Sequence, residues 1–168
     1  MRIFLTGSTG FIGNALVWKL VELGYNLNVL CRPGSDRGFL KHPQISVFSG
    51  DITEFASIAP AIKGCEAVFH LAALAKNWAR DKDLYNHINV QGTKNILEQS
   101  LQNTIRKIVV TSTCMTFGPS NEHPTDESTP SSAVGFTDYD RTKKITEDII
   151  QHYVQAGLDI SVVNPTRV

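Results

Sequence analysis

Thr6-Gly7-Ser8-Thr9-Gly10-Phe11-Ile12-Gly13 is the stretch of sequence that decides the fold. It follows a short apolar run, Ile3–Thr6, and opens a segment in which apolar residues recur at helical spacing. A glycine-rich turn between a strand and a helix is the context that a dinucleotide-binding turn requires. Gly7 is expected to permit the tight turn, Gly10 to let a pyrophosphate approach, and Gly13 to let helix and strand pack closely. The alternative is a glycine-rich turn without a ligand, since the spacing G-x-x-G-x-x-G differs from the G-x-G-x-x-G of ordinary dehydrogenases.

Short apolar runs alternate with longer helical patterns along the rest of the chain. The runs lack a clean alternation of apolar and polar residues, as strands buried on both faces do. They are Ile3–Thr6, Leu27–Cys31, Ile45–Phe48, Ala67–Leu71, Ile108–Thr111 and Ile160–Val163. The helical patterns lie near residues 12–23, Phe55–Ile62, Leu84–Leu101 and Tyr139–Ala156. This order predicts an α/β fold of the Rossmann type, a doubly wound parallel sheet with helices on both faces.

The composition is that of one globular domain. The chain has 168 residues, of which 42% are hydrophobic and 19% charged, and this argues against intrinsic disorder. Lys plus Arg and Asp plus Glu number 16 each, so the zero net charge argues against a nucleic-acid partner. No run reaches the roughly 18 apolar residues of a transmembrane helix. A small-molecule partner is therefore expected, with neither nucleic acid nor membrane.

Three further features concern location and completeness. The residues before the glycine turn leave no room for a signal peptide. The three cysteines have no metal-type spacing and are expected to be reduced: Cys31, Cys65 and Cys114. A cytoplasmic protein without a metal site is the resulting prediction. The chain stops just past its last predicted strand, so residues 1–168 are expected to be the cofactor-binding domain of a longer protein, whose C-terminal substrate domain is missing here.

The end of the second predicted strand bears on the choice between NAD and NADP. An NAD-specific fold usually places an acidic residue there, on the ribose 2′-hydroxyl. Here Arg32, Ser35 and Arg37 cluster instead. A guanidinium matches the geometry of a 2′-phosphate, so the cluster favours NADP, with NAD still possible. The alternative is a solvated basic loop.

Tyr139 and Lys143 form a Y-x-x-x-K pair on the helix that follows the fifth strand. Residues four apart share one face of a helix, so the Lys143 ammonium is expected to lower the pKa of the Tyr139 phenol. A tyrosine tuned in this way exchanges a proton with a carbonyl or an alcohol. Just upstream, residues 111–118 carry four hydroxyls, most of which are expected to cap turns. His70 is expected to be a structural histidine, with a catalytic base as the alternative.

The combination of these motifs resembles the extended short-chain dehydrogenase/reductases, the NAD(P)-dependent epimerase/dehydratase family. The motifs that carry the resemblance stand in family order along the whole chain. They are the glycine turn, Gly50-Asp51-Ile52, His70-Leu71-Ala72-Ala73, Asn89-Val90-Gln91-Gly92-Thr93, Thr113, Tyr139 with Lys143, and Asn164-Pro165-Thr166. The Arg32 cluster and residues 76–82 are more similar to the dihydroflavonol-reductase and 3β-hydroxysteroid-dehydrogenase branch.

The resemblance implies a role for each of these motifs. Thr113, Tyr139 and Lys143 would be the catalytic residues, and Lys143 would also hold the nicotinamide ribose. The other cofactor-binding residues would be Gly7, Thr9, Gly10, Phe11, Ile12, Gly13, Arg32, Asp51, Ile52, Leu71, Ala72, Ala73, Asn89, Thr111 and Pro165, with Asp51 and Ile52 at the adenine and Pro165 beside the nicotinamide. Phe117 stands where the family often has a tyrosine that lines sugar-nucleotide sites.

Three functions stay open at this point. The first is an NADP-dependent oxidoreductase that transfers hydride between nicotinamide and a ketone or alcohol. The second is a nucleotide-sugar epimerase or dehydratase with bound NAD, and the third is a non-catalytic dinucleotide-binding module. Family members are about twice as long as this chain and usually form dimers through two helices, here Leu84–Leu101 and Tyr139–Ala156.

Overall fold

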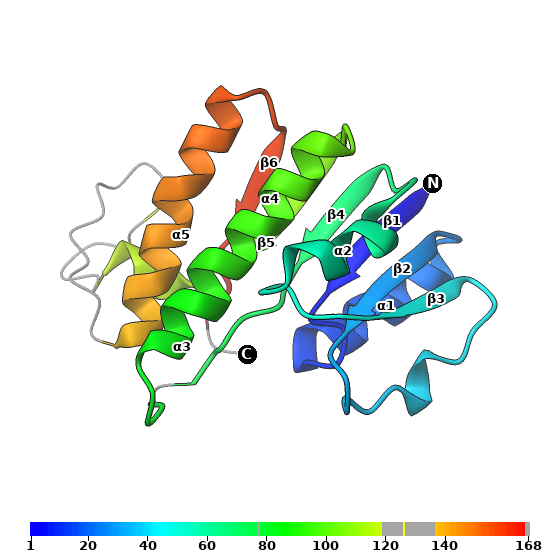
Figure 1. Ribbon diagram of the computed structural model, residues 1–168, viewed down its shortest axis with the longest axis horizontal. Coiled ribbons are helices and arrows are strands. Elements are labelled where there is room, and N and C mark those ends of the chain that lie inside the picture. Colours follow the sequence, from blue (N-terminus) through cyan, green and yellow to red (C-terminus); the bar gives the residue numbers. More distant parts are fainter. Residues whose placement is uncertain (77, 119–125, 127–136, 167–168) are drawn as a thin grey trace.

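A six-stranded parallel sheet forms the centre of the computed structural model, which describes residues 1–76, 78–118, 126 and 137–166 (Figure 1). The strands stand in the order β3-β2-β1-β4-β5-β6. They are β1 (Arg2–Thr6), β2 (Asn26–Cys31), β3 (Ile45–Ser49), β4 (Ala67–His70), β5 (Lys107–Thr111) and β6 (Ile160–Val163). This order confirms the doubly wound fold and places the reversal of strand order between β1 and β4.

Helices cover both faces of the sheet (Figure 1). On one face lies α1 (Phe11–Glu22), and on the other lie α2 (Phe55–Ile62), α4 (Gly92–Gln102) and α5 (Asp138–Gln155). Shorter helical turns complete the described chain: η1 (Gly38–Leu40), α3 (Asp83–Tyr85), η2 (Asn86–Gln91) and η3 (Cys114–Phe117). No helix among the described residues is both long and apolar enough to cross a bilayer.

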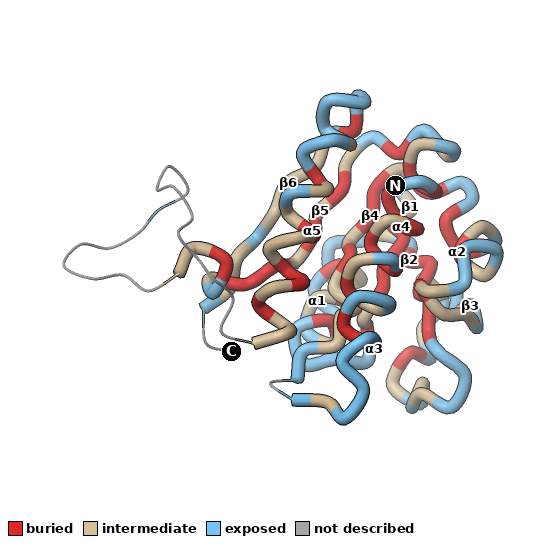
Figure 2. Tube along the Cα trace, turned by 60° about the vertical axis from the view of Figure 1, so that its left-hand side comes forward, coloured by how far each residue is buried: buried red, intermediate tan, exposed pale blue. Residues whose placement is uncertain are grey.

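Each face of the sheet packs its own hydrophobic core, because successive residues of a strand point to opposite faces. In β1, Phe4 joins the core beneath α2, α4 and α5, while Ile3 and Leu5 join the core beneath α1. Burial of both faces explains the apolar runs of the four inner strands. The edge strands β3 and β6, also expected to be buried on both faces, are only partly buried, because each has a neighbouring strand on one side only. Figure 2 shows the buried segments concentrated in the strands and on the inner sides of the helices.

The single helix expected over Leu84–Leu101 differs in detail. The chain is helical from Asp83 to Gln102, but η2 in its middle is a π-helical turn. At its end Gly92 packs against the Ile52 side chain, where an added Cβ would come within 2.6 Å of Ile52 Cδ1. Hydrophobic periodicity does not report such a local widening, which is frequent at functional sites. The two prolines and many small polar residues of residues 120–137 also predict an exposed loop, and of these residues only Asp126 and Thr137 are among those described.

Candidate functional site

A cleft of about 400 Å³ opens at the carboxyl ends of β1 and β4, where the strand order reverses. This is where doubly wound sheets bind their ligands. Nine of the predicted cofactor-binding residues line it: Gly7, Thr9, Gly10, Arg32, Asp51, Ile52, Leu71, Ala72 and Ala73. The rest of the lining is Thr6, Leu30, Cys31, Ser35, Gly50, Leu74, Ala75, Lys76 and Ile88.

Each of the three glycines of the turn has a different steric surrounding. Gly7 has φ +77°, and a Cβ there would lie 2.6 Å from the Ala72 nitrogen. At Gly13 a Cβ would lie 2.1 Å from the Gly7 carbonyl oxygen, so α1 packs directly on the turn. Gly10 lines the cleft, and its Cβ would meet only the Gly7 oxygen, at 3.3 Å. A side chain at Gly10 would therefore occupy cleft space rather than collide with the fold.

The N-terminus of α1 presents backbone donors beside this turn. Its N-cap, Gly10, supplies no side-chain hydrogen bond, and the first turn of this fully described helix holds no acidic residue. An anion fits such a terminus, because the first N–H groups lack intrahelical acceptors and the helix dipole is positive there. Phe11 and Ile12 do not line the cleft, and the Phe11 side chain is 83% exposed.

The basic cluster predicted after β2 is divided by the structure. Arg32, which is exposed, and Ser35 line the rim of the cleft. Arg37 is not among the residues that line it. The Arg37 guanidinium instead donates to the carbonyls of Arg32 at 2.8 Å and Cys31 at 3.2 Å, and to the Ser49 hydroxyl at 3.2 Å. Arg37 therefore ties the loop to the ends of β2 and β3.

Asp51 and Ile52 form the wall of the cleft that follows β3. The Asp51 carboxylate accepts hydrogen bonds from the Thr53 amide and hydroxyl, each at 2.9 Å. Ile52 is buried and packs on Gly92. The loop is thus rigid before any ligand contacts it.

The opposite wall is the connection from β4 to α3. Only the first half of this wall was predicted from the sequence. Leu74, Ala75 and Lys76 continue the lining beyond Ala73, as their position directly after a strand end could have indicated. Two buried side chains anchor this wall. Asn89 accepts from the Leu74 amide at 2.7 Å, and the Tyr85 hydroxyl donates to the Lys76 carbonyl at 2.7 Å. Asn89 does not line the cleft itself.

His70 lies at the centre of a directed chain of hydrogen bonds. The Thr93 hydroxyl donates to the Asn89 carbonyl at 2.7 Å, so its oxygen accepts from His70 Nε2–H at 2.9 Å. His70 Nδ1 then accepts from the Thr6 hydroxyl at 2.7 Å, and the Thr6 oxygen accepts from the Ala72 amide at 3.3 Å. Burial and then the charge of Lys143 lower the pKa of His70 to about 3. His70 is a neutral structural residue, as expected.

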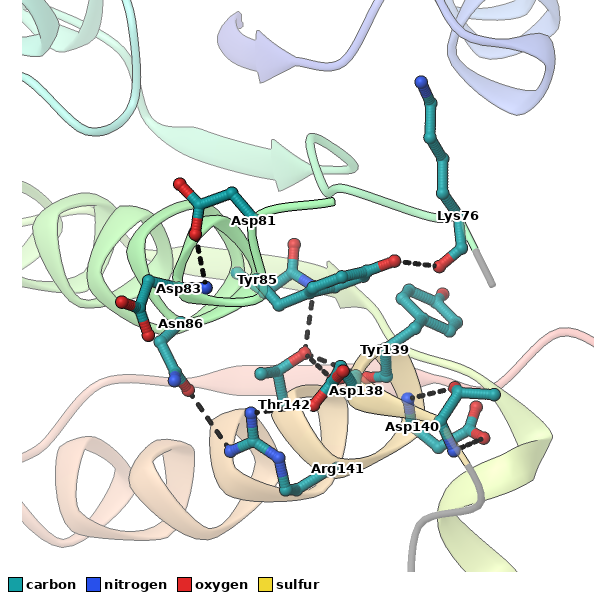
Figure 3. A network of polar contacts seen from close by, with 12 residues as sticks. Lys76, Asp81, Asp83, Tyr85, Asn86, Asp138, Tyr139, Asp140, Arg141 and Thr142 are labelled. Carbon is teal, nitrogen blue, oxygen red and sulfur yellow. Dashed lines mark hydrogen bonds and ion pairs between the residues drawn. The ribbon is translucent and has the colours of Figure 1, made fainter. Parts of the chain in front are cut away.

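Tyr139 stands in the first turn of α5, on the far side of the wall formed by residues 74–76. The helix begins with a capping box, in which the Thr137 hydroxyl accepts from the Asp140 amide and the Asp140 carboxylate from the Thr137 amide, both at 3.1 Å. Figure 3 shows the Tyr139 ring pointing toward the Lys76 backbone, beside the Tyr85 hydroxyl. Asn89 also donates to the Thr142 hydroxyl at 3.0 Å, which joins α5 to the same wall.

The expectation that Lys143 lowers the pKa of Tyr139 is wrong for this structure. Burial raises that pKa, and the charges of Asp140 and Cys114 add to the rise. Lys143 is turned inward from the same helix face. Its ammonium donates to the Thr111 carbonyl at 2.6 Å, and only 3% of the residue is exposed. Burial lowers the pKa of Lys143 to about 8, against the opposing charge of Glu147.

Thr113 is buried at the start of η3, beside the turn that follows β6. Its hydroxyl accepts from the Met115 amide at 3.3 Å, a capping role, and its carbonyl accepts from the Asn164 side chain at 3.1 Å. The Pro165 carbonyl accepts from the Cys114 amide at 3.1 Å. Thr111, Thr113 and Pro165 are therefore near one another at the ends of β5 and β6, outside the lining of the cleft. Among the described residues no group of three or more His, Cys, Asp or Glu could hold a metal ion.

Comparison with known proteins identifies the family. The NAD dependent epimerase/dehydratase family matches this chain over residues 3–168. The chain belongs to that family. A dihydroflavonol 4-reductase candidate of Synechocystis sp. is 33% identical over 165 residues, which cover 97% of this chain and 48% of the relative. The 3 beta-hydroxysteroid dehydrogenase/Delta 5→4-isomerase of Mycobacterium tuberculosis is 32% identical over 170 residues, which cover 94% and 44%.

Solved structures of the epimerase/dehydratase family share the fold. The UDP-glucose 4-epimerase of Thermus thermophilus in complex with NAD superposes with a TM-score of 0.86 and 25% identity, over 98% of this chain and 54% of that one. The chain thus spans about half the length of the relatives it matches. The description of the family is NAD dependent, and the Thermus thermophilus structure is a complex with NAD.

Proposed function

We propose that this chain is the cofactor-binding half of an NADP-dependent oxidoreductase that reduces a ketone, or oxidises the corresponding alcohol. The observation that carries the proposal is the cleft over the glycine turn, with Tyr139 directed at the outside of its wall. When bound, the nicotinamide supplies or accepts the hydride. The protein's own residues bind the dinucleotide, orient the substrate oxygen and move one proton.

The residues of the cleft fit a dinucleotide. A pyrophosphate suits the space above Gly10, where any side chain would intrude, and the uncapped N-terminus of α1. Asp51 and Ile52 lie at the end of the cleft near β2 and β3 and are assigned to the adenosine. The wall formed by Leu71, Ala72 and Ala73 leads toward α5, where Lys143 is assigned to the nicotinamide ribose and Pro165 to the nicotinamide.

Tyr139 is assigned as the proton donor, with Thr113 and Lys143 beside it. The Tyr139 phenol carries a proton at neutral pH and can donate it to a ketone oxygen. In this structure burial raises its pKa, which makes it a weaker acid than a free tyrosine. The Thr113 hydroxyl is assigned to hold that oxygen, and Lys143 to balance the negative charge that develops there. Phe117 in place of the tyrosine often found in sugar-nucleotide sites supports a ketone reductase.

A single substitution tests the proposed preference for NADP over NAD. Replacing Arg32 with Ala is expected to weaken NADPH binding by about 10- to 100-fold, the effect of losing a charge-assisted contact to the 2′-phosphate. NADH binding is expected to change little. The measurement is a titration of the 168-residue chain, followed by nicotinamide fluorescence.

Arg106→Ala is the matched control for the Arg32 variant. It also removes one exposed guanidinium, but at the start of β5, where Arg106 faces Glu66 at 3.8 Å. It is expected to leave the affinity for both cofactors unchanged. Tighter binding of NADH than of NADPH by the wild-type chain would contradict the preference for NADP.

A nucleotide-sugar epimerase is the second candidate, favoured by the likeness to the UDP-glucose 4-epimerase in complex with NAD. It predicts NAD that remains bound through purification, and conversion of a UDP-sugar without net use of cofactor. The reductase predicts consumption of NADPH with a ketone substrate. The first ketone probes are a dihydroflavonol, which itself carries a ketone, and the 3-ketone that corresponds to a 3β-hydroxysteroid, because the names of the relatives contain those compounds.

The proposal also extends to assembly and location. A homodimer is expected to form through α4 and α5, and sedimentation velocity at several protein concentrations tests it. A single species with the mass of one chain at all concentrations would contradict it. A reducing compartment such as the cytoplasm fits the three free thiols of Cys31, Cys65 and Cys114.

A further inference from the structure

Glu147 joins the catalytic helix to the ends of two strands. It lies one turn after Lys143 on α5, half-buried, and one of its carboxylate oxygens, Oε1, accepts two hydrogen bonds. One comes from the Ser112 hydroxyl, just past the end of β5. The other comes from the Asn164 amide, just past the end of β6, at 2.8 Å. A charged acceptor makes such bonds stronger than a neutral one does.

The same contacts fix the segment that carries Thr113. Ser112 precedes Thr113 in the chain, and the Asn164 amide that reaches Glu147 also donates to the Thr113 carbonyl at 3.1 Å and to the Thr116 hydroxyl at 3.1 Å. The Ser112 amide in turn donates to the Val163 carbonyl at 2.7 Å. Displacing the Glu147 side chain would therefore remove one of the links between the Thr113 segment and α5, beside the bond from Lys143 to Thr111.

The charge of Glu147 also acts on the Lys143 ammonium. The buried ammonium donates to the Thr111 carbonyl from β5. Glu147 lies four residues later on the same face of α5, and the charge of Lys143 also acts on neutral His70 from β4. Among these groups Glu147 is the one that carries negative charge, and it opposes the effect of burial on the pKa of Lys143. Lys143 is needed as a cation in the proposed reaction.

We propose that Glu147 is a positioning residue, which holds the Thr113 segment against α5 and places a carboxylate on the same helix face as the buried Lys143 ammonium. The inference rests on the proposed function, since it is through Thr113 and Lys143 that Glu147 would act on the reaction. Two substitutions separate its two effects. Glu147→Gln keeps an oxygen that accepts from Ser112 and Asn164 but removes the charge, whereas Glu147→Ala removes both.

The test is an NMR titration of lysine ¹³Cε signals in the 168-residue chain, with the Lys143 signal assigned from a Lys143→Arg variant. In Glu147→Gln the midpoint of the Lys143 titration is expected to move to lower pH by about one pH unit, the effect of losing one opposite charge near a buried group. The Thr113 amide signal is expected to move in Glu147→Ala and to stay close to its wild-type position in Glu147→Gln.

Asp148→Asn is the matched control, because it removes the neighbouring carboxylate of α5, which pairs with exposed Lys144 at 2.6 Å. It is expected to leave the Lys143 titration unchanged. The alkaline limb of the pH–rate profile is expected to move to lower pH in Glu147→Gln, together with the Lys143 midpoint, while urea unfolding checks that the variant is folded.

The outcomes separate this inference from the proposed function. A Lys143 titration that is identical in wild type and Glu147→Gln would overturn the role of Glu147, whatever the activity. A shifted titration in a chain that binds neither NADPH nor NADH would overturn the proposed function, while the effect of Glu147 on Lys143 would stand.

Discussion

Replacing Tyr139 with Phe is expected to slow hydride transfer by about 10²- to 10⁴-fold, the contribution of a positioned general acid. The loss is expected in the rate rather than in cofactor affinity, because Phe keeps the ring that faces the Lys76 segment and removes only the hydroxyl. Burial and nearby Asp140 raise the pKa of Tyr139, so the wild-type phenol is protonated when the ketone binds. The measurement is NADPH oxidation in single turnovers, in the longer protein of which we propose this chain to be the cofactor-binding half.

Tyr153→Phe is the control for this prediction. Tyr153 lies on the same helix, and its hydroxyl donates to the exposed Glu98 carboxylate at 2.7 Å, away from the cleft. Its loss is expected to leave the rate unchanged. A Tyr139→Phe enzyme as fast as wild type would remove Tyr139 from the mechanism and favour a non-catalytic dinucleotide-binding module.

In the proposed enzyme these residues would form only one wall of the substrate site, so the rate is to be measured in the longer protein. Orientation of the substrate supplies much of the rate of an enzyme, and relatives are about twice as long as this chain. We therefore expect the 168-residue chain to bind dinucleotide with its formed cleft, yet to turn over slowly. Rapid turnover by the chain alone would contradict this expectation.

The parts of the site that sequence predicted well are local in the chain. The glycine turn is defined by residues within one strand end and one helix start, and the clash distances at Gly7 and Gly13 show why no other residue fits. The four inner strands were recognisable because burial on both faces makes most of their residues apolar, and the partly buried edge strands β3 and β6 because their short runs follow the same order of elements. Short-range spacing also placed Tyr139 and Lys143 on one helix.

What the sequence could not show depends on contacts between distant segments. Tyr139 and Lys143 share a helix face. However, the Lys143 ammonium is buried and donates to the carbonyl of Thr111, 32 residues away, instead of facing the Tyr139 phenol. The sequence places Arg37 beside Arg32 and Ser35, but it does not show that the Arg37 guanidinium donates to two backbone carbonyls. Glu147 has no motif of its own, because its partners Ser112 and Asn164 lie 35 and 17 residues away.

Buried polar side chains connect the cleft at the ends of β1 and β4 to α5. Asn89 holds the cleft wall through Leu74 and α5 through Thr142, and its carbonyl receives the Thr93 hydroxyl of the His70 chain. Every buried side-chain nitrogen and oxygen among the described residues has a hydrogen-bond partner. Such a satisfied network costs little while intact and much when one member changes its protonation.

His70 is that member in acid, and the chain is expected to lose several kcal/mol of stability as pH falls from about 6.5 toward 3. The pKa of His70 is lowered in the folded chain, from 6.5 to about 3, by burial and then by Lys143. Between these values the unfolded chain binds a proton that the folded chain does not, so the free energy of unfolding rises with pH through this window. Above pH 6.5 the contribution of His70 to stability is complete. Urea unfolding from pH 4 to 7.5 measures the slope.

His70→Gln isolates the contribution of this residue from that of the carboxylates, which also titrate in acid. A Gln side chain can accept from Thr6 and donate to Thr93, yet it has no proton to gain, so its stability is expected to depend less on pH than that of wild type. His152→Gln, at an exposed position in the last turn of α5, is expected to keep the wild-type slope. Equal slopes in wild type and His70→Gln would show that His70 does not titrate against folding, and that Thr6 and Thr93 tolerate a charged imidazole between them.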